Sequence, residues 1–147
     1  MNIKKLILDS YTIPLPVPVK AYAAGLMTGF DIVVVRITDE NGNEGQGYTT
    51  GHTGFGGSIV RIIKDSFESI LIGEDSARIE YLWLKMWKKT HYVGRGGQAS
   101  FAISAVDAAL WDLLGKRLKQ PLWKLLGGYT PKVKVYAGNI DLNFPIE

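Results

Sequence analysis

The polar side chains best suited to chemistry in this sequence lie in and just before a glycine-rich stretch, residues 51–57. His52 lies inside this stretch, and the hydroxyls of Tyr48 and Thr50 precede it closely. These three groups can donate and accept hydrogen bonds, which suits the binding of a hydroxylated acid. The alternative is an ordinary glycine-rich connector with one exposed, pH-sensitive histidine, and the sequence leaves both interpretations open.

A second glycine-rich stretch, residues 93–97, contains Arg95 and follows His91. A guanidinium group can hold a carboxylate through two parallel hydrogen bonds. However, Gly-Arg-Gly-Gly before a helix is typical of a turn. A structural role for Arg95 is therefore favoured over anion binding.

Two aspartates, Asp107 and Asp112, interrupt an otherwise apolar segment and raise the question of metal binding. Five residues apart on a helix, their side chains would point about 140° apart around the axis, so they cannot hold one ion together. Hydrogen bonding to loops or to basic side chains is expected instead, because a buried carboxylate needs partners. Likewise Trp83, Met86 and Trp87 form a helical stripe, which indicates core packing rather than a cofactor site.

The composition is that of a globular domain and excludes several classes of function. The 147 residues are 46% hydrophobic and 21% charged, with a net charge of +3 and no cysteine. The basic residues are dispersed, so no nucleic-acid partner is expected. Without cysteine there are no disulfides, thiolate catalysis or cysteine-bound zinc. Asp9 and Ser10 break the first apolar run too early for a signal peptide, and no stretch approaches the roughly 20 residues of a membrane span. A cytoplasmic location is expected.

The beginning of the chain predicts a strand. Residues 3–14 place apolar side chains among polar ones, as strands do. Pro14, Pro16 and Pro18 cannot donate hydrogen bonds to a sheet, so pairing is expected to end there. A loop is expected to follow, near residues 20–29.

A hairpin is the clearest local signal. Residues 31–38 form a β-branched run and residues 44–50 a second strand. Asn41-Gly42 between them supplies the positive φ angles of a tight turn. Gly45 and Gly47 predict the close approach of another backbone, or a bulge, at the last strand.

After the hairpin the apolar residues recur at helical spacing. This period predicts helices over residues 59–70, 79–87 and 98–118. Asp75 or Ser76 is expected to cap the second helix. The third helix is apolar on nearly every side, so it is expected to lie enclosed between layers.

Strands followed by helices indicate an α+β fold: a three-stranded antiparallel meander followed by a three- to four-helix bundle. Pro121 is expected to start a last short helix, which Gly127-Gly128 ends. Residues 132–141 then predict a strand with no partner in this unit. We therefore expect one domain over residues 1–130 and the beginning of a second over residues 131–147.

Three segments of the second half carry a specific motif. They are AISAVDAALWDLLGK at residues 102–116, QPLWKLLGG at 120–128 and VKVYA at 133–137. At this spacing they resemble the mandelate racemase and muconate lactonizing enzyme branch of the enolase superfamily. The hairpin at residues 35–48 resembles the meander of that family's N-terminal capping domain. The resemblance implies an enolase N-terminal-like fold over the mouth of a (β/α) barrel, of which residues 131–147 would be the first strand.

The resemblance also implies a chemistry that resides in the barrel. There a lysine or histidine base removes the proton α to a carboxylate, and Mg²⁺ on three acidic ligands stabilises the enediolate. The acidic triad, the Lys-x-Lys and the His-Asp pair of that barrel do not occur in this chain. We therefore expect no catalytic and no metal-binding residue here, and an inactive fragment. Lys132 and Lys134 imitate Lys-x-Lys, but they lie at the start of their strand, whereas barrels present chemistry at the carboxyl ends.

Substrate contacts are implied at three places if the family geometry holds. The loop at residues 20–28 would contribute Tyr22 and Met27, and the end of the barrel strand would contribute Tyr136 and Asn139. The glycine-rich loop would contribute Tyr48, Thr50, His52 and Phe55, and its glycines would let it move as a lid.

The function implied by the resemblance is the capping, substrate-selecting part of a Mg²⁺-dependent enzyme. Its substrate would be a small carboxylate, and the full-length protein would form homo-oligomers. An acid-sugar dehydratase is favoured, because hydroxyl and imidazole groups suit polyhydroxy acids and dehydratases are common in this branch. A racemase or cycloisomerase is the first alternative. The second is a free-standing, non-catalytic binding domain, which a stop codon directly after Glu147 would favour.

Overall fold

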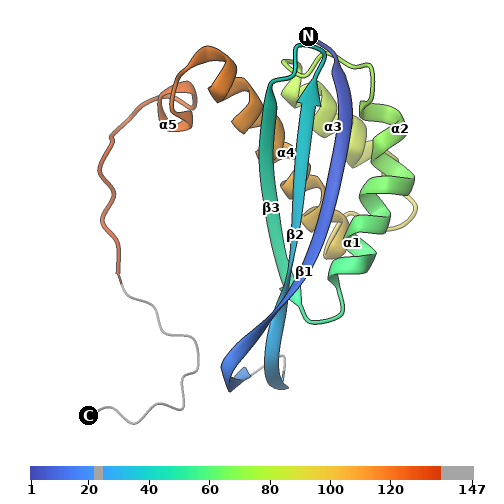
Figure 1. Cartoon of the computed structure of the whole chain (residues 1–147), viewed down its shortest axis with the longest axis vertical. Coiled ribbons are helices and arrows are strands. Elements are labelled where there is room, and N and C mark those ends of the chain that lie inside the picture. Colours follow the sequence, from blue (N-terminus) through green and yellow to red (C-terminus); the bar gives the residue numbers. More distant parts are fainter. Residues whose placement is uncertain (22–24, 137–147) are drawn as a thin grey trace.

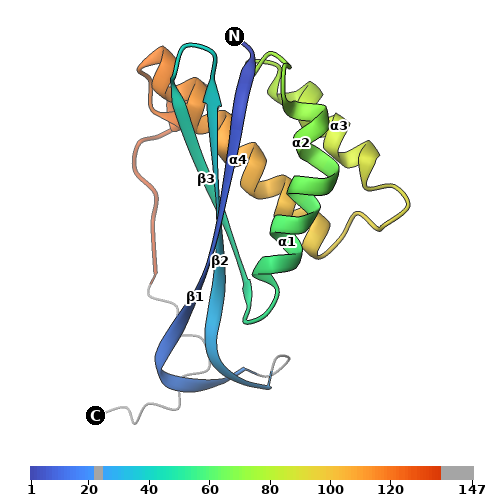
Figure 2. The same cartoon turned by 45° about the vertical axis from the view of Figure 1, so that its right-hand side comes forward.

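The computed structural model describes residues 1–21 and 25–136, which form two layers that face each other (Figures 1 and 2). One layer is an antiparallel sheet in the order β1-β2-β3, made of β1 (Ile3–Ala21), β2 (Gly25–Asp39) and β3 (Glu44–His52). The helices cover one face of this sheet (Figure 2). The predicted meander followed by helices is therefore confirmed.

The β1–β2 hairpin is longer than the sequence suggested, and two expectations about it were wrong. Pairing reaches Pro14, opposite Gly29, then shifts register and resumes at Val19, opposite Met27. Because β1 is an edge strand, proline can lack its N–H on the unpaired side without breaking the ladder. Much of the expected loop near residues 20–29 is consequently strand, and the hairpin projects past the helices as an arm (Figure 1).

The first helical segment consists of α1 (Gly56–Ile62), a π-helical turn η1 (Ile63–Phe67) and α2 (Glu68–Leu71). Its fully buried side chains recur every four residues, at Ile59, Ile63, Phe67 and Leu71. In an ideal α-helix that spacing drifts by about 40° per step around the axis. The wider π turn offsets the drift and keeps the stripe on the core. The sequence predicted this helix but not its π turn.

The start of α3 (Ile79–Lys89) differs from the expected capping. Arg78 holds the N-cap position, without a side-chain cap. Asp75 instead binds the amino group of Met1, at 2.9 Å, and accepts a hydrogen bond from the backbone N–H of Ala77. The hydroxyl of Ser76 donates to the carbonyl oxygen of Met1. The side chains of Asp75 and Ser76 therefore bind the N-terminus of the chain and do not cap α3.

Helix α4 (Gln98–Leu118) lies against the sheet and against α1 and α3, and α5 (Leu122–Leu125) follows it. A methyl group at Gly45 would collide with the carbonyl oxygen of Ala109, and one at Gly47 with that of Ala105. The two glycines thus let the helix backbone touch the strand, as the sequence predicted. The expectation that α4 is enclosed is wrong for one side of the helix, because the side toward the sheet and the other helices is buried, whereas Ser100, Phe101, Ser104 and Ala108 are exposed.

The core lies between the sheet and the helices. It is formed by inward side chains of the strands and by the buried stripes of the helices, including Leu6, Val33, Val35, Ile37, Ile59, Phe67, Leu82, Met86, Val106, Leu110 and Leu113. Trp83 and Trp87 stack on each other at 5.2 Å and pack against this core. The Trp/Met stripe therefore serves packing.

Residues 131–136 follow α5 in an extended course without strand pairing. The strand expected over residues 132–141 is thus not formed over 132–136, and its remainder lies outside the described residues. Val135 is 90% exposed. A strand needs a neighbour to satisfy its backbone groups, and the sheet of this domain offers none at this point. Over the described ranges, no helix has the length and apolarity required to cross a bilayer.

Candidate functional site: a carbon-rich pocket at the rim of the sheet

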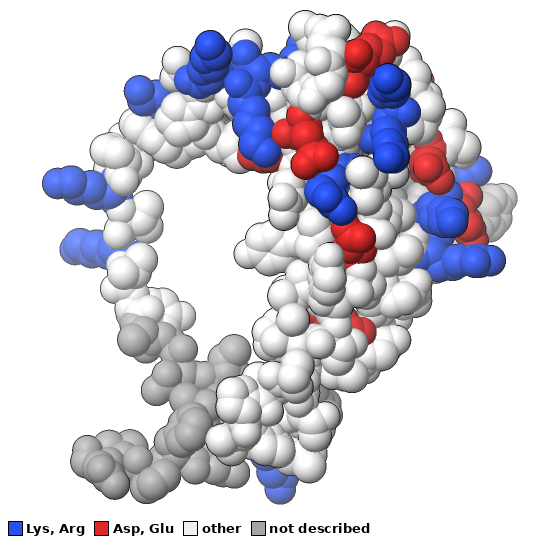
Figure 3. Space-filling model, viewed as in Figure 1, with Lys and Arg blue, Asp and Glu red and all other residues white. Residues whose placement is uncertain are grey.

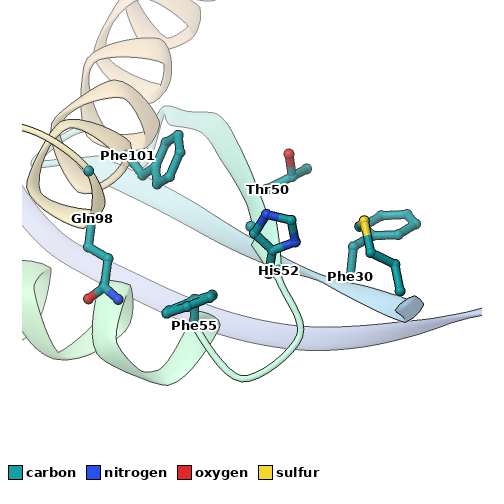
Figure 4. Close-up of a pocket in the computed structure, with 9 residues that line it drawn as sticks. Phe30, Thr50, His52, Phe55, Gln98 and Phe101 are labelled. Carbon is teal, nitrogen blue, oxygen red and sulfur yellow. The ribbon is translucent and has the colours of Figure 1, made fainter. Parts of the chain in front are cut away.

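A pocket of about 500 Å³ opens where the end of β3 meets the start of α4 (Figure 4). Strands, the glycine-rich loop and the helix all contribute to it. Its lining residues are Met27, Phe30, Thr50, Gly51, His52, Phe55, Gly97, Gln98 and Phe101. Segments more than forty residues apart in sequence thus meet around one hollow.

The geometry of β2 and β3 explains how Phe30, Thr50 and His52 come together. Thr50 and His52 are two residues apart on β3, so they project from the same side of the strand. Phe30 of β2 is the register partner of His52. Figure 4 shows Phe30, His52 and Thr50 along the strands, with Gln98 and Phe101 facing them from α4.

The glycine-rich loop turns back toward the pocket immediately after β3. The backbone N–H of Phe55 donates to the carbonyl oxygen of His52 at 3.1 Å, which closes a tight turn. The rings of His52 and Phe55 meet edge to face, with centroids 6.2 Å apart. An adjoining pocket of about 360 Å³ shares Met27, His52 and Phe55 with the first. These three side chains therefore separate two neighbouring hollows.

Four of the predicted substrate-contact residues come together here: Met27, Thr50, His52 and Phe55. Tyr48 does not line the pocket. Tyr48 lies two residues before Thr50 on β3, and its side chain is 64% exposed. Tyr136 is 91% exposed on the extended C-terminal stretch and is not among the lining residues. Tyr22 and Asn139 lie outside the described residues. Substrate contact itself stays a prediction for all of them.

The sequence interpretation missed four lining residues, namely Phe30, Gly97, Gln98 and Phe101, whereas Gly51 belongs to the loop at residues 48–55 that was expected to face the active site. One signal was available for Phe101, because a large aromatic side chain stands out in the alanine-rich start of α4. Pairing of Phe30 with His52 also follows from the hairpin register once the turn at Asn41-Gly42 is placed. The position of Gln98 depends on how α4 packs, which no local pattern reveals.

The pocket is lined mainly by apolar side chains and glycine. Of its nine lining residues, Thr50, His52 and Gln98 carry polar side chains, and four others carry large apolar ones. Within residues 1–21 and 25–136, no group of three or more histidines and acids lies close enough to hold a metal ion. The described residues therefore do not fit a magnesium site. The pocket can shape and orient a ligand that is largely apolar on one side.

The other candidate residues have structural surroundings. Arg95 contacts Nδ1 of His91 through a guanidinium nitrogen, at 3.0 Å, and lies over the ring of Trp87. Asp112 accepts a hydrogen bond from the backbone N–H of Gln46 at 2.7 Å and pairs with Lys116. These contacts match the structural roles favoured for Arg95 and Asp112.

Asp107 faces a small hollow beside Trp83 and Trp87, away from the pocket described above. Burial raises the pKa of its carboxyl group, and the negative charge of Glu80 raises it further. Asp107 and Asp112 thus lie in different surroundings and do not form a common site.

Charge on the molecular surface is mixed. In Figure 3, Lys and Arg alternate with Asp and Glu over the upper right and right-hand regions of the molecule, whereas Lys and Arg gather with little acid along the upper left. The lower region of the sheet, in the same view, is largely uncharged.

A meander with helices on one face is the fold class of enolase-superfamily N-terminal domains, and the sequence agrees. The family profile described as "Mandelate racemase / muconate lactonizing enzyme, N-terminal domain" matches residues 6–127. This chain therefore belongs to the mandelate racemase and muconate lactonizing enzyme family of the enolase superfamily.

Individual relatives include enzymes with different activities. The 3,6-anhydro-α-L-galactonate cycloisomerase of Streptomyces coelicolor is 46% identical over 144 residues, which cover 98% of this chain and 40% of that protein. The arabinonate dehydratase of Saccharolobus solfataricus is 42% identical over 106 residues, covering 72% of this chain and 28% of that enzyme. The chain thus spans less than half the length of these relatives.

Solved structures show the same fold. A racemase from Streptomyces coelicolor with bound magnesium matches with a TM-score of 0.92 and 46% identity, over 97% of this chain and 40% of that one. The L-talarate/galactarate dehydratase of Salmonella typhimurium, with Mg and L-lyxarohydroxamate, matches with a TM-score of 0.77 and 33% identity, over 85% and 33%. The expected enolase N-terminal-like fold is therefore confirmed.

Proposed function

We propose that this chain is the substrate-capping domain of a longer enolase-superfamily enzyme that removes a proton α to the carboxylate of an acid sugar. In this proposal residues 1–130 form the cap and residues 131–147 begin the barrel. The short coverage of the relatives supports it, since more than half of each relative lies beyond the matched region. The pocket supports it too, because it can bind a small molecule but offers no complete catalytic set.

Magnesium belongs to this proposal as a cofactor of the barrel. Two of the similar structures contain the ion. The described region of this chain lacks a cluster of acidic ligands for it. The ion would therefore be held by residues outside the described region, in the barrel, where it would stabilise the negative charge that develops on the substrate.

The carbon-rich wall of the pocket favours an anhydro acid sugar as substrate, and hence a cycloisomerase. An anhydro ring presents more C–H surface and fewer hydroxyls than an open-chain acid. Phe30, Phe55 and Phe101 can cover such a surface, whereas buried hydroxyls would each need a hydrogen-bond partner. The extensive similarity to the 3,6-anhydro-α-L-galactonate cycloisomerase points in the same direction.

An acid-sugar dehydratase is the second candidate. Similarity to the arabinonate and the talarate/galactarate dehydratases supports it. Thr50, His52 and Gln98 could hydrogen-bond the hydroxyls of an open-chain acid. Racemisation is a third candidate within the same chemistry, since a racemase structure is also similar.

The decisive test uses the protein encoded by the full reading frame around this sequence. It would be incubated with Mg²⁺ and, separately, with 3,6-anhydro-L-galactonate, arabinonate and galactarate, and products would be followed by NMR. We expect kcat/KM for the anhydro acid to exceed that for the open-chain acids by about 100-fold. EDTA should abolish turnover, and added Mg²⁺ should restore it. Preference for an open-chain acid would support the dehydratase instead.

Two outcomes would contradict the enzyme proposal altogether. One is a reading frame that stops directly after Glu147, which would leave a free-standing binding domain. The other is a full-length protein that turns over none of the acids with Mg²⁺ present. Cytoplasmic location and homo-oligomer formation also remain predictions, and cell fractionation and light scattering of the full-length protein would check them.

A further inference from the structure

A buried carboxylate, Asp31, lies beneath the glycine-rich loop and outside the pocket lining. It belongs to β2, on the side of the sheet that faces the helices, and is only 4% exposed. Its register partners are Thr12 on β1 and Gly51 on β3. Asp31 therefore occupies the middle of the sheet at the point where β3 leads into the loop.

Both oxygens of this carboxylate accept hydrogen bonds. Oδ1 accepts the hydroxyl of Thr12 at 2.7 Å. Oδ2 accepts the backbone N–H groups of Gly54 and Gly56, each at 2.8 Å. Two of these three donors belong to the loop, so one side chain fastens the loop to the sheet.

The donors lie at the junction between the loop and α1. Gly54 has a φ of +94°, a left-handed conformation in which other residues are strained. Gly56 is the first residue of α1, and the residue at the N-cap, Phe55, has no side-chain acceptor. Asp31 thus acts as an N-cap from a neighbouring strand, with a negative charge at the helix start.

Space at this junction is restricted as well. A methyl group at Gly56 would collide with the hydroxyl oxygen of Ser10 and approach Oδ2 of Asp31 to 3.2 Å. The backbone of the loop therefore lies directly on the carboxylate. The residues held on either side of Gly54, His52 and Phe55, both line the pocket.

We infer that Asp31 is a positioning residue that fixes the turn at residues 52–56 as a pre-formed wall of the pocket and thereby strengthens substrate binding. The effect on binding rests on the proposed function of the pocket, whereas the fixed turn does not. In this inference the turn at residues 52–56 is held in place by Asp31, whereas the glycines of the loop by themselves predicted a mobile lid. Pre-organisation of this kind lowers the cost of binding, because the wall is ordered before the ligand arrives.

Asp39 provides a matched control. It lies on the same strand and the same side of the sheet, and it is fully buried. Its carboxylate accepts the backbone N–H groups of Asn41 and Asn43, at 2.9 and 3.0 Å. It thus fastens the opposite hairpin end, about eight strand residues or 27 Å from Asp31. Replacement of Asp39 removes comparable bonds without touching the pocket.

The experiment compares Asp31→Ala, Asp31→Asn and Asp39→Ala in the full-reading-frame protein. Hydrogen exchange would be measured by mass spectrometry on a peptide that covers residues 52–57. We expect exchange there to accelerate about tenfold or more in Asp31→Ala, since bonds to a charged acceptor are lost. In Asp39→Ala, exchange at 52–57 should stay unchanged while exchange at 39–44 accelerates.

Steady-state kinetics with 3,6-anhydro-L-galactonate, and with arabinonate if that is the better substrate, test the effect on binding. We expect Asp31→Ala to raise KM about tenfold with kcat nearly unchanged, because an ordered wall acts on binding rather than on chemistry. Asp31→Asn keeps one acceptor oxygen and should recover some of the loss. If Asp31→Ala does not fold, the Asn variant decides, with a smaller change in the same direction.

Unchanged exchange at residues 52–57 in the folded Asp31 variants would overturn the inference. So would an equal rise in KM in Asp39→Ala, since that would indicate general destabilisation. If the unaltered protein turns over no acid sugar, the proposed function fails, and the exchange measurement still decides whether Asp31 holds the turn.

Discussion

His52 and Tyr48 are both polar aromatic residues of β3, but they lie differently relative to the pocket. Both side chains project from the same side of β3, but His52, at the end of the strand, lines the pocket, whereas Tyr48 does not line it and is 64% exposed. The imidazole can offer one donor and one acceptor to a ligand. Phe55 meets the His52 ring edge to face, which restricts its orientation. At the residue scale, specificity in this domain should therefore depend on His52 more than on Tyr48.

Replacement of these two residues provides a direct comparison. In the full-reading-frame protein, His52→Ala should change the ratio of kcat/KM between two acid sugars about tenfold, the value of one hydrogen bond. Tyr48→Phe should change that ratio less, and thermal melting should show both variants folded. Equal effects of the two changes would contradict the conclusion that His52 lines the pocket and Tyr48 does not.

Two buried carboxylates, Asp31 and Asp39, should make the free energy of unfolding depend on pH in the acid range. Hydrogen bonds from Gly56 and Thr12 lower the pKa of Asp31 below its usual 3.8 despite the opposing effect of burial. Burial raises the pKa of Asp39, but hydrogen bonds from Asn43 and Asn41 outweigh it, so the net change is again downward. Each group therefore stabilises the folded state while it is ionised.

The sign of the effect follows from proton binding. Below pH 3.8 the unfolded chain takes up protons at these groups before the folded protein does, so stability falls as pH falls through that range. Urea unfolding at pH 7, 5, 4 and 3 would measure how the free energy of unfolding changes with pH. In Asp31→Asn this free energy should change less with pH than in the unaltered protein. A free energy of unfolding that stays constant down to pH 3 would contradict this prediction.

At the scale of elements, the contact between β3 and α4 is set by glycine. At Gly47 a methyl group would collide with the carbonyl oxygen of Ala105 and reach the backbone nitrogen of Ala109 at 2.5 Å. Backbone atoms cannot move aside like the end of a flexible side chain, so α4 itself would have to shift. The pocket depends on this contact, because Gln98 and Phe101 are carried by the same helix.

Gly47→Ala should destabilise the domain by about 3 kcal/mol, the upper range for forcing extra atoms into a packed interior. The matched control is Gly57→Ala, since a methyl group there meets nothing within 4 Å and the residue is helical. That change should be neutral or stabilising by up to about 1 kcal/mol. Urea denaturation of both variants would show the difference, and equal stabilities would refute the close-packing argument.

For the whole molecule, apolar surface near the end of α4 and in α5 should govern association of the isolated 147-residue chain. Leu118, Trp123 and Leu126 are exposed there, and Phe101 is partly exposed near the start of the helix. Large apolar side chains that are exposed in an isolated domain are typical of surfaces that a further domain or partner covers. The proposed barrel would provide such a cover.

Sedimentation velocity would test this. The isolated chain should associate increasingly with concentration, and added salt should not weaken the association, because apolar contacts are not screened. Leu126→Lys should reduce it by placing a charge in the apolar patch. A monomer at every concentration would show that this surface tolerates water and needs no cover.

Local patterns were sufficient for most elements of this fold. The hairpin at Asn41-Gly42, the strand alternation around it and the apolar period of residues 98–118 each depend on neighbours in sequence. The segments at 102–116 and 120–128 also sufficed for the family, which residues 6–127 match. The close contact at Gly45 and Gly47 was predictable because a strand seldom tolerates two glycines without such a reason.

Tertiary packing decided the rest. Pairing past Pro14 depends on β1 being an edge strand, and the role of Asp31 depends on a loop that returns to it from β3. The pocket unites Met27, His52 and Gln98, which no periodicity connects. Periodicity reports only which side of an element is apolar. Which side chains meet across elements is set by how those apolar sides pack together, and that is decided only in the folded molecule.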